Sequence, residues 1–213
     1  MISAEPNFDR VARVYRWAEY LSLGPILQQT RTHFIPYLRD RRHVLLLGDG
    51  DGRFLARLLQ QNQHLTALAV DTSAAMLQLL CHRCHFAANR LTTRKGSALN
   101  TFIPPETDLV VTHFLLDCLT QPDVDRLTSA IVAAVQPGAL WLVSDFQLPR
   151  SRLLRPFAFL YIRALYLAFR ILTGLRVHSL PNPQRSLTAA GFTRIARHQR
   201  LFGLLYTELW RLD

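Results

Sequence analysis

A run of glycines directly after an apolar segment constrains the fold of this chain more than any other sequence feature. Residues His43 to Leu47 form a short apolar run, and Gly48-Asp49-Gly50-Asp51-Gly52 follows it directly. A run of this length fits a strand buried on both faces. The glycines permit a tight turn and let a ligand approach the backbone, beside the positive end of a helix expected at 53–60. The sequence therefore predicts a strand–turn–helix unit that binds a nucleotide-like ligand.

The spacing and charge of this turn indicate the kind of ligand. Dinucleotide-binding enzymes use a GxGxxG pattern, which seats a pyrophosphate at the N-terminus of the helix. The pattern here is GxGxG, and its two acids, Asp49 and Asp51, would repel a pyrophosphate. The same acids suit a ligand that carries an ammonium and a sulfonium group. The turn therefore disfavours a nicotinamide oxidoreductase and favours S-adenosylmethionine (SAM).

An acid at the end of the second predicted strand supports this interpretation. The second apolar run ends at Asp71, which lies 19 residues after Gly52. A carboxylate at this place accepts hydrogen bonds from both hydroxyls of a ribose. Thr72-Ser73 then offers an N-cap for a helix that reaches Asn89, so Asp71 has an alternative role as part of a helix cap.

The remaining segments alternate between strand and helix patterns, which is typical of a parallel sheet covered by helices on both faces. Further elements are expected as strands at 92–95, 109–113 and 139–144, a helix at 122–135, and a closing antiparallel pair at 192–198 and 201–209. We therefore predict an α/β, Rossmann-like, doubly wound sheet of seven mostly parallel strands with an antiparallel C-terminal strand. The length fits one SAM-binding domain over 1–213, with an N-terminal helical lid at 1–40 and an arginine-rich helical insertion at 150–190.

The order of short motifs along the chain resembles that of the class I SAM-dependent methyltransferases. Within that family it is similar to the branch of menaquinone and ubiquinone C-methyltransferases. The motifs run through nearly the whole chain: Phe8 to Tyr15, the glycine turn, Ala69-Val70-Asp71, Gly96-Ser97-Ala98, Thr107 to Val111, Gln136 to Ala139 and Ala190-Gly191-Phe192. The resemblance implies that the cofactor is SAM and that the protein is a methyltransferase.

The resemblance also implies a cofactor site. The glycine turn would lie under the methionine portion of SAM, the acid after the second strand would hold the ribose, and the segment after the third strand would flank the adenine. A lid from the N-terminal segment would cover the site. The implied cofactor residues are Tyr15, Gly48, Asp49, Gly50, Asp51, Gly52, Asp71, Thr72, Ser97, Ala98, His113 and Phe114. Such proteins usually have an acid where this chain has Leu46, which leaves Asp49 or Asp51 to contact the amino group.

The segment that follows the fourth predicted strand contains the candidate catalytic residues, His113 and Asp117. Methyl transfer depends on alignment of the nucleophile behind the sulfonium methyl group, and a base is needed only where the acceptor loses a proton. His113 could take that proton near neutral pH. Asp117 could orient the His113 side chain or hold a substrate proton. In the alternative interpretation, His113 contacts the cofactor through its backbone and Asp117 caps a turn.

The positive charge of the chain is concentrated in its last third. The net charge is +10, yet residues 146–207 contain no Asp or Glu and ten Arg. Within this part, residues 153–175 are mostly apolar, but Arg155, Arg163 and Arg170 fall on one helical stripe, which argues against a membrane span. The segment fits a helix over the acceptor pocket, a helix on an anionic membrane surface, or a core or dimer helix. The aromatic residues of the segment favour a small or lipid-like acceptor, such as a quinone or phenol.

Other classes of function and partner are less well supported by the sequence. Cys81-His82-Arg83-Cys84-His85 matches a haem-attachment pattern, but it lies in a predicted helix without a second ligand pair, so we expect no metal. No nucleic-acid reader module is recognisable. The chain opens without a secretory signal pattern, so we expect a cytoplasmic protein. This expectation includes a protein that contacts the membrane surface peripherally. The alternative function is a non-catalytic SAM-binding or membrane-surface module, and the oligomeric state stays open.

Overall fold

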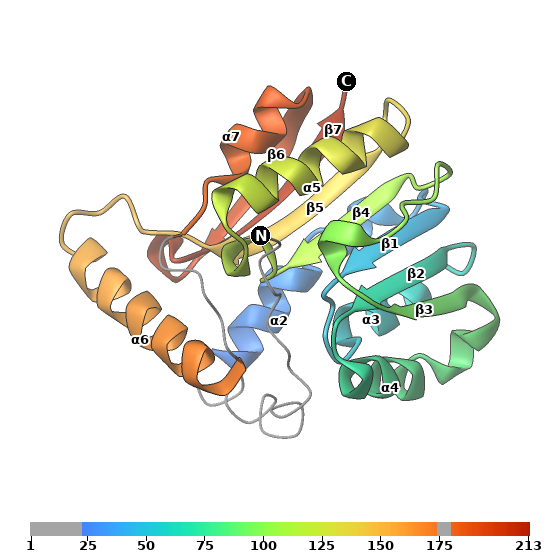
Figure 1. Cartoon of the computed structure of the whole chain (residues 1–213), viewed down its shortest axis with the longest axis horizontal. Helices are drawn as coiled ribbons and strands as arrows, with labels where there is room; N and C mark the ends of the chain where they lie inside the picture. Colours follow the sequence, from blue (N-terminus) through green and yellow to red (C-terminus); the bar gives the residue numbers. More distant parts are fainter. Residues whose placement is uncertain (1–22, 174–179) are drawn as a thin grey trace.

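The computed structural model describes residues 23–173 and 180–213, and it arranges seven strands in one sheet (Figure 1). The strand order is β3-β2-β1-β4-β5-β7-β6, and β7 runs antiparallel to both of its neighbours, whereas the other pairs are parallel. The strands are β1 (His43–Leu47), β2 (Thr66–Asp71), β3 (Leu91–Lys95), β4 (Leu109–His113), β5 (Leu140–Phe146), β6 (Phe192–Arg200) and β7 (Leu205–Leu212). The predicted mixed seven-stranded sheet is confirmed.

The register of the parallel strands brings three predicted site segments to one edge of the sheet. Leu47 of β1 aligns with Val70 of β2 and with Thr112 of β4. Gly48, Asp71 and His113 each come one residue later, so they lie in one row at the carboxyl ends of the strands. Because the chain leaves β1 toward β2 on one side and reaches β4 on the other, this row lies where doubly wound sheets bind ligands.

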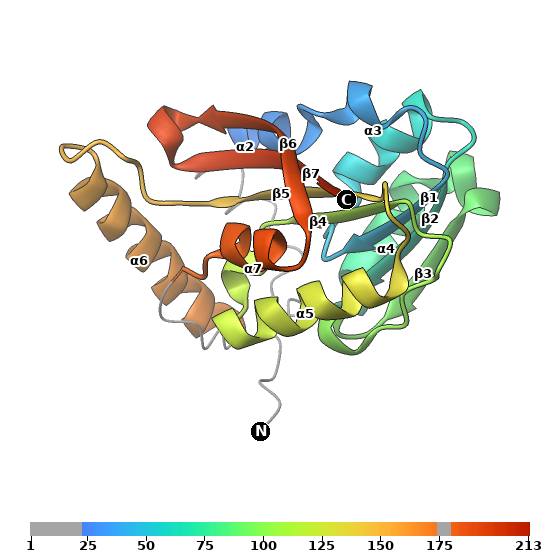
Figure 2. The same ribbon diagram turned by 90° about the horizontal axis from the view of Figure 1, so that it is seen from above.

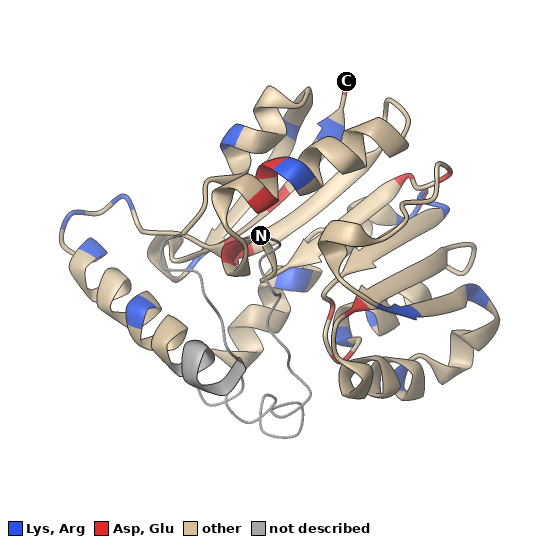
Figure 3. Cartoon of the chain, in the orientation of Figure 1, with Lys and Arg blue, Asp and Glu red and all other residues tan. Residues whose placement is uncertain are grey.

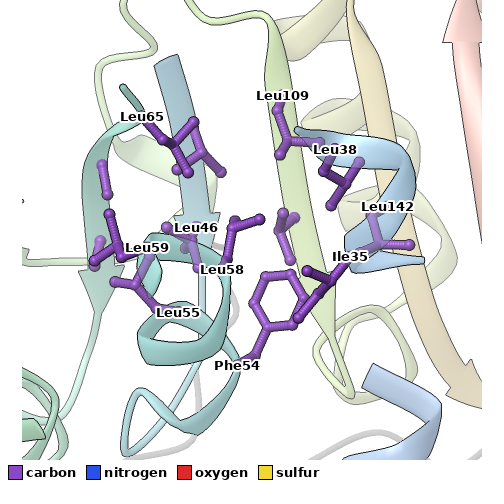
Figure 4. Close-up of a cluster of buried hydrophobic side chains, with 14 of the residues drawn as sticks. Ile35, Leu38, Leu46, Phe54, Leu55, Leu58, Leu59, Leu65, Leu109 and Leu142 are labelled. Carbon is purple, nitrogen blue, oxygen red and sulfur yellow. The ribbon is translucent and has the colours of Figure 1, made fainter. Parts of the chain in front are cut away.

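One face of the sheet is covered by the helices near the N-terminal half of the described chain. These helices are α2 (Gly24–Thr32), η1 (Ile35–Leu38), α3 (Arg53–Gln61) and α4 (Ala74–Arg83). Leu46 of β1 points into this layer, where it packs with Phe54 and Leu58 of α3 (Figure 4). A buried Leu46 therefore contributes to the core and not to the ligand edge of the sheet.

The opposite face carries η3 (Ala98–Asn100), α5 (Gln121–Ala134) and α7 (Pro183–Ala189), so that helices lie on both sides of the sheet (Figure 2). Leu45 and Leu47 pack into this second layer, because alternate residues of a strand point to opposite faces. Trp141 of β5 also lies there, and its indole Nε1 donates a hydrogen bond to Thr112 Oγ1 at 3.0 Å. The continuous apolar run of β1 is explained by burial on both faces.

The insertion between β5 and β6 contains α6 (Arg155–Thr173) and α7. In Figure 1, α6 lies beyond the edge of the sheet at which the parallel strands have their carboxyl ends. Its inner side packs in a third apolar cluster, which includes Ile162, Tyr166 and Phe146. The Tyr166 hydroxyl donates a hydrogen bond to the Asp117 carbonyl oxygen at 2.9 Å. This bond joins α6 to η4 (Leu116–Cys118), the short turn after β4. Within the described residues, no helix is both long and apolar enough to cross a membrane.

Several element boundaries differ from the sequence-based expectation. The helix expected to reach Asn89 ends at Arg83, and a 3₁₀ segment, η2 (His85–Arg90), follows. The Arg90 guanidinium donates hydrogen bonds to the carbonyls of Leu59, Asn62 and Leu65, which turns the chain back toward β3. The last strand begins four residues later than expected, because a turn, η5 (Leu201–Gly203), joins β6 to β7.

The N-terminal lid can be compared with the structure only in part. The sequence predicts two helices between residues 7 and 38, and the described residues contain α2 and η1 from this segment. The segment with Tyr15 lies outside the described residues.

Candidate active site

The glycine turn has the backbone conformation that its sequence predicts. Gly48, Gly50 and Gly52 all have positive φ, at 68°, 65° and 75°. A Cβ atom on Gly52 would lie 2.8 Å from Leu80 Cγ, so this glycine permits close packing of α4 against the start of α3. A Cβ atom on Gly50 would meet nothing within 4 Å. Gly50 therefore exposes backbone to a ligand, whereas Gly52 serves the packing behind the turn.

A cavity that is open to solvent lies at the carboxyl ends of β1, β2 and β4. The cavity is lined by nine of the residues predicted for the cofactor: Gly48, Asp49, Gly50, Asp51, Asp71, Thr72, Ala98, His113 and Phe114. Gly52 and Ser97 are not in the lining, and Tyr15 lies outside the described residues. The fold thus brings together side chains from four separate segments of the sequence.

The two acids of the turn differ in their partners. The Asp51 carboxylate receives hydrogen bonds from Arg53 Nε and Arg83 Nη2, both at 2.9 Å, so two guanidinium groups compensate its charge. Asp49 Oδ2 accepts a long hydrogen bond from the Leu55 amide at 3.4 Å. Asp49 Oδ1 is buried and has no hydrogen-bond partner among the described residues. Asp49 is therefore the acid that retains binding capacity for a cationic group.

Burial sets the protonation of Asp49. Desolvation raises the pKa of its carboxyl group to about 7, against the opposing effects of the nearby Arg31 guanidinium and the Leu55 amide. A ligand ammonium beside this carboxyl would restore its ionisation, because an opposite charge favours the charged form. The site is thus charged most readily when a cation occupies it.

Asp71 and Thr72 lie at the end of β2 and line the cavity. Asp71 Oδ1 accepts a hydrogen bond from the Ser73 amide at 2.8 Å, and Ser73 Oγ caps α4 by accepting from the Met76 amide at 3.2 Å. The helix-cap role considered for Asp71 is therefore present, and it holds the carboxylate in place at the cavity. The two roles are compatible, since a carboxylate accepts several hydrogen bonds.

Ser97 has a local structural role in the segment after β3. Its Oγ accepts a hydrogen bond from the Leu99 amide at 3.1 Å and caps η3. Its neighbours Gly96 and Ala98 line the cavity in its place.

The cavity also has lining residues that the sequence analysis did not include: Arg31, Arg53, Val70, Met76, Gly96, Leu115, Cys118 and Leu119. Arg31 is the most unexpected of them, because this α2 residue is only 8% exposed and its guanidinium lies 5.0 Å from the centre of the Phe114 ring. A nine-residue helix far from the glycine turn in sequence carries no local signal for this position. Met76 had a weak signal, as a large residue in the first turn of the helix after Asp71.

His113 lies in the cavity wall but is poorly suited to carry charge. Its ring packs edge-on against Phe54, with the centroids 4.4 Å apart. Both ring nitrogens are buried without hydrogen-bond partners among the described residues. Desolvation, with a contribution from Arg31, lowers the pKa of His113 well below its usual range. The imidazole is therefore neutral near pH 7 and can accept a hydrogen bond from a ligand.

Asp117 does not line the cavity; it is buried beneath it, beside Asp145 of β5. Burial raises the pKa of both carboxyl groups, and for Asp145 the negative charge of Asp117 raises it further. The raised pKa values favour the protonated forms of these two buried carboxyl groups over a pair of ionised carboxylates. Asp145 continues the buried row of Trp141 and Val143 on β5. An acid in this core row was a usable sequence signal, but the expected strand ended at Ser144.

The Cys81–His85 segment forms the end of α4 and the start of η2. Cys84 is buried and Cys81 is exposed, and both are free thiols. Among the described residues, no group of three His, Cys, Asp or Glu side chains is arranged to hold a metal ion.

Comparison with known proteins identifies the domain to which this cavity belongs. A family described as "Methyltransferase domain" matches residues 45–141, which extend from β1 through the glycine turn, β2 and β4 to β5. Residues 45–141 are therefore similar in sequence to a methyltransferase domain. No curated protein matches the chain in sequence.

Solved methyltransferase structures share the fold. They include mitomycin 7-O-methyltransferase, with a TM-score of 0.69 and 16% identity over 97% of this chain and 61% of that protein. A family 2 O-methyltransferase from Planctomyces limnophilus in complex with apigenin has a TM-score of 0.70 and 20% identity. That similarity covers 96% of this chain and 62% of the other protein. An N-methyltransferase from Bradyrhizobium japonicum in complex with S-adenosyl-L-homocysteine (SAH) has a TM-score of 0.64 and 12% identity, over 90% and 88%.

These similarities are to O- and N-methyltransferases, so the expected relation to the quinone C-methyltransferase branch stays a prediction. The chain spans about three fifths of the length of the first two proteins, at 61% and 62%. The similarity to these two proteins is a similarity of fold that extends over nearly all of this chain.

Proposed function

We propose that this protein transfers a methyl group from SAM to a small apolar acceptor that carries a hydroxyl or amino group. The observation that carries the proposal is the placement of Asp49 and Asp71 at adjacent strand ends, around the open backbone of Gly50. The first acid offers a buried carboxylate oxygen without a hydrogen-bond partner among the described residues, and the second is held at the cavity by the Ser73 amide.

The charges in the cavity suit the methionine portion of the cofactor. Asp49 would bind the ammonium group, and Arg31 would bind the carboxylate from the opposite element, α2. Asp71 and Thr72 would hold the ribose, while Ala98 would contact the adenine. Bound SAM supplies an electrophilic methyl group on its sulfonium. This arrangement also explains the absence of an acid at Leu46, because Asp49 replaces it.

The side of the cavity toward α6 suits an apolar acceptor. Phe114 and Phe146 lie there with ring centroids 5.3 Å apart, and both belong to the third apolar cluster together with Cys118 and Tyr166. Such a surface excludes water and leaves the reacting groups to be aligned by packing. One protein with this fold, the family 2 O-methyltransferase from Planctomyces limnophilus, was solved in complex with apigenin, which fits this class. A phenolic or quinone-like acceptor is therefore the chemistry that we propose.

Two groups are candidates for the proton that the acceptor loses. His113 lines the cavity and is neutral, so it can accept a hydrogen bond from an acceptor hydroxyl group and take its proton only as the methyl group is transferred, because burial opposes the charged imidazolium. Asp117 and Asp145 lie close to the same region, and burial raises the pKa of both carboxyl groups, which favours their protonated forms. We assign proton acceptance to His113, because Asp117 does not reach the cavity surface. The backbone carbonyl of Asp117 holds η4 against Tyr166, and we assign no proton transfer to its side chain.

The test of the cofactor site is calorimetric titration of the protein with SAM and with SAH, compared for wild type and Asp71→Ala. We expect the variant to lose binding of both compounds while its circular dichroism spectrum is unchanged. Glu106→Ala is the matched control, because Glu106 is an exposed acid away from the cavity. Unchanged affinity in Asp71→Ala would show that the assignment of the cofactor site is wrong.

Transfer itself is tested with methyl-labelled SAM and a panel of phenols, quinols and aromatic amines. Label on an acceptor, lost in His113→Ala but with SAM affinity retained, is the expected result. Tight SAM binding without transfer to any acceptor would instead support a non-catalytic SAM-binding module. The buried, unpartnered nitrogens of His113 are the observation that favours an enzyme, since their desolvation costs stability without a structural gain.

A further inference from the structure

The helix α6 is apolar on two opposite sides. One side packs on the third apolar cluster through Ala158, Ile162 and Tyr166. The other side exposes a stripe at helical spacing, in which Phe157 is 74% and Leu160 69% exposed, and Leu167 continues the stripe. A helix at the surface of a globular domain normally presents polar residues to water. The outer side of α6 therefore lacks the composition of a solvated face.

The turn between β6 and β7 lies beside the same end of the molecule. Gln147 lies in the loop from β5 to α6. Its side-chain Nε2 donates a hydrogen bond to the Gly203 carbonyl at 2.7 Å, and its backbone N–H donates one to the Leu204 carbonyl. Figures 1 and 2 both show this turn next to that loop. Phe202 at the tip is 85% exposed and has a positive φ of 55°. The loop itself exposes Leu153, so the apolar stripe of α6 extends beyond the helix.

The charges around this surface are all positive. Arg150, Arg152, Arg155 and Arg163 lie on the loop and on α6, and Figure 3 shows no acidic position on either. We define the basic–apolar surface as these four arginines with the exposed apolar residues Leu153, Phe157, Leu160, Leu167 and Phe202. No Asp or Glu occurs between residues 146 and 207 to compensate the arginines locally.

The composition of the basic–apolar surface selects among possible partners. A second copy of the chain, placed symmetrically on this surface, would bring arginines against arginines, which disfavours association. An anionic lipid surface complements both features, because headgroups neutralise the arginines while the apolar stripe enters the acyl boundary. Lipid also covers large apolar side chains without specific shape complementarity.

We propose that the basic–apolar surface docks this protein on an anionic membrane surface, with α6 lying in the plane of the interface. The inner side of the same helix is bonded through Tyr166 to Asp117, one residue before Cys118 of the cavity wall. Docking would therefore bring the acceptor side of the cavity close to the lipid. If the proposed methyl transfer holds, this placement favours an acceptor that is dissolved in the membrane.

Flotation of the full chain with vesicles tests the docking independently of catalysis. We expect binding to vesicles of phosphatidylcholine mixed with phosphatidylserine, and little binding to phosphatidylcholine alone. Phe157→Ser combined with Leu160→Ser should lower the partition coefficient by about a hundredfold, since each large apolar side chain changes it by roughly tenfold or more. Arg152→Gln combined with Arg155→Gln should weaken binding to the anionic vesicles only.

Control variants distinguish docking through this surface from non-specific adsorption to vesicles and from loss of folding. Phe102→Ser and Arg57→Gln change an exposed apolar and an exposed basic residue elsewhere, and we expect wild-type flotation. SAM affinity should be unchanged in all surface variants, so a failure of docking is distinguishable from a failure of the proposed function. The proposal is overturned by equal binding to neutral vesicles, by no binding to either, or by a dimer that Phe157→Ser disrupts. Preferential binding of single-stranded RNA through the same arginines would also overturn it.

Discussion

Asp49 offers the sharpest test of how the cavity recognises its ligand, because its protonation couples folding to binding. Its pKa is raised from the 3.8 of a free aspartate to about 7, chiefly by burial. SAM binding through the ammonium group requires the ionised carboxylate. The affinity for SAM should therefore fall as pH decreases through 7, by roughly tenfold for each further pH unit.

The same carboxyl group affects the stability of the ligand-free protein with the opposite sign. The unfolded chain releases this proton near pH 4, whereas the folded protein releases it near pH 7. Between these values the folded state binds more protons, so the free energy of unfolding decreases as pH rises. A full shift of this size corresponds to about 4 kcal/mol. Asp49→Asn should remove this pH-dependent loss.

The assay combines calorimetric titration with SAM between pH 5.5 and about pH 7.5 with urea denaturation of the ligand-free protein over the same interval. Wild type should lose affinity at low pH, whereas Asp49→Asn should bind weakly with little pH dependence and should be the more stable protein at the upper end. Asp40→Asn, at an exposed acid, is the matched control and should retain the wild-type slope. The reasoning is refuted if wild-type affinity is constant over this range, or if Asp49→Asn keeps the slope.

Two further substitutions test the glycine turn and the buried acid pair. Gly52→Ala should lower the free energy of unfolding by about 2–4 kcal/mol, because positive φ and the contact with Leu80 both oppose a Cβ atom. Gly50→Ala should cost only about 1 kcal/mol in urea denaturation but should weaken SAM binding more, and equal stability losses in the two variants would contradict this. Asp145→Asn should gain stability relative to wild type as pH rises from about 5 to 8, because the raised pKa of Asp145 makes its ionisation costly in the folded state. A stability difference that is the same at both pH values would show that Asp145 does not titrate differently in the folded and unfolded chain.

The sheet could be predicted because its signals are local and repeated. The apolar run of β1, the positive-φ glycines and the acid after β2 each act within a few residues, and parallel strands put their carboxyl ends at one edge. Nine of the predicted cofactor residues line the cavity for this reason. The ends of α4 and β7 were placed less well, because Arg90 and the turn at Phe202 depend on contacts between distant segments.

Some residues have a role that depends on a partner distant in the sequence. The sequence either does not predict these residues or predicts the same role for two that differ. Asp49 and Asp51 have the same residue type and almost the same position, but only Asp51 meets Arg83 from α4. Arg31 enters the cavity because α2 packs across the chain onto α3 and β7. Likewise, Asp145 is recognisable as part of an acid pair only when Asp117 lies beside it.

The sequence alone determined that this chain folds as a doubly wound sheet with a glycine turn, and it predicted two acids at a nucleoside site, because periodicity and backbone conformation are short-range properties. Only the tertiary structure decided which acid keeps a carboxylate oxygen without a partner among the described residues, which arginine of α2 lines the cavity, and which side of α6 is buried. Phe157 and Tyr166 are both aromatic residues of one apolar helix in the sequence. In the folded protein, Tyr166 packs against η4, whereas Phe157 is exposed. The two residues differ because burial depends on the neighbours that the whole fold supplies.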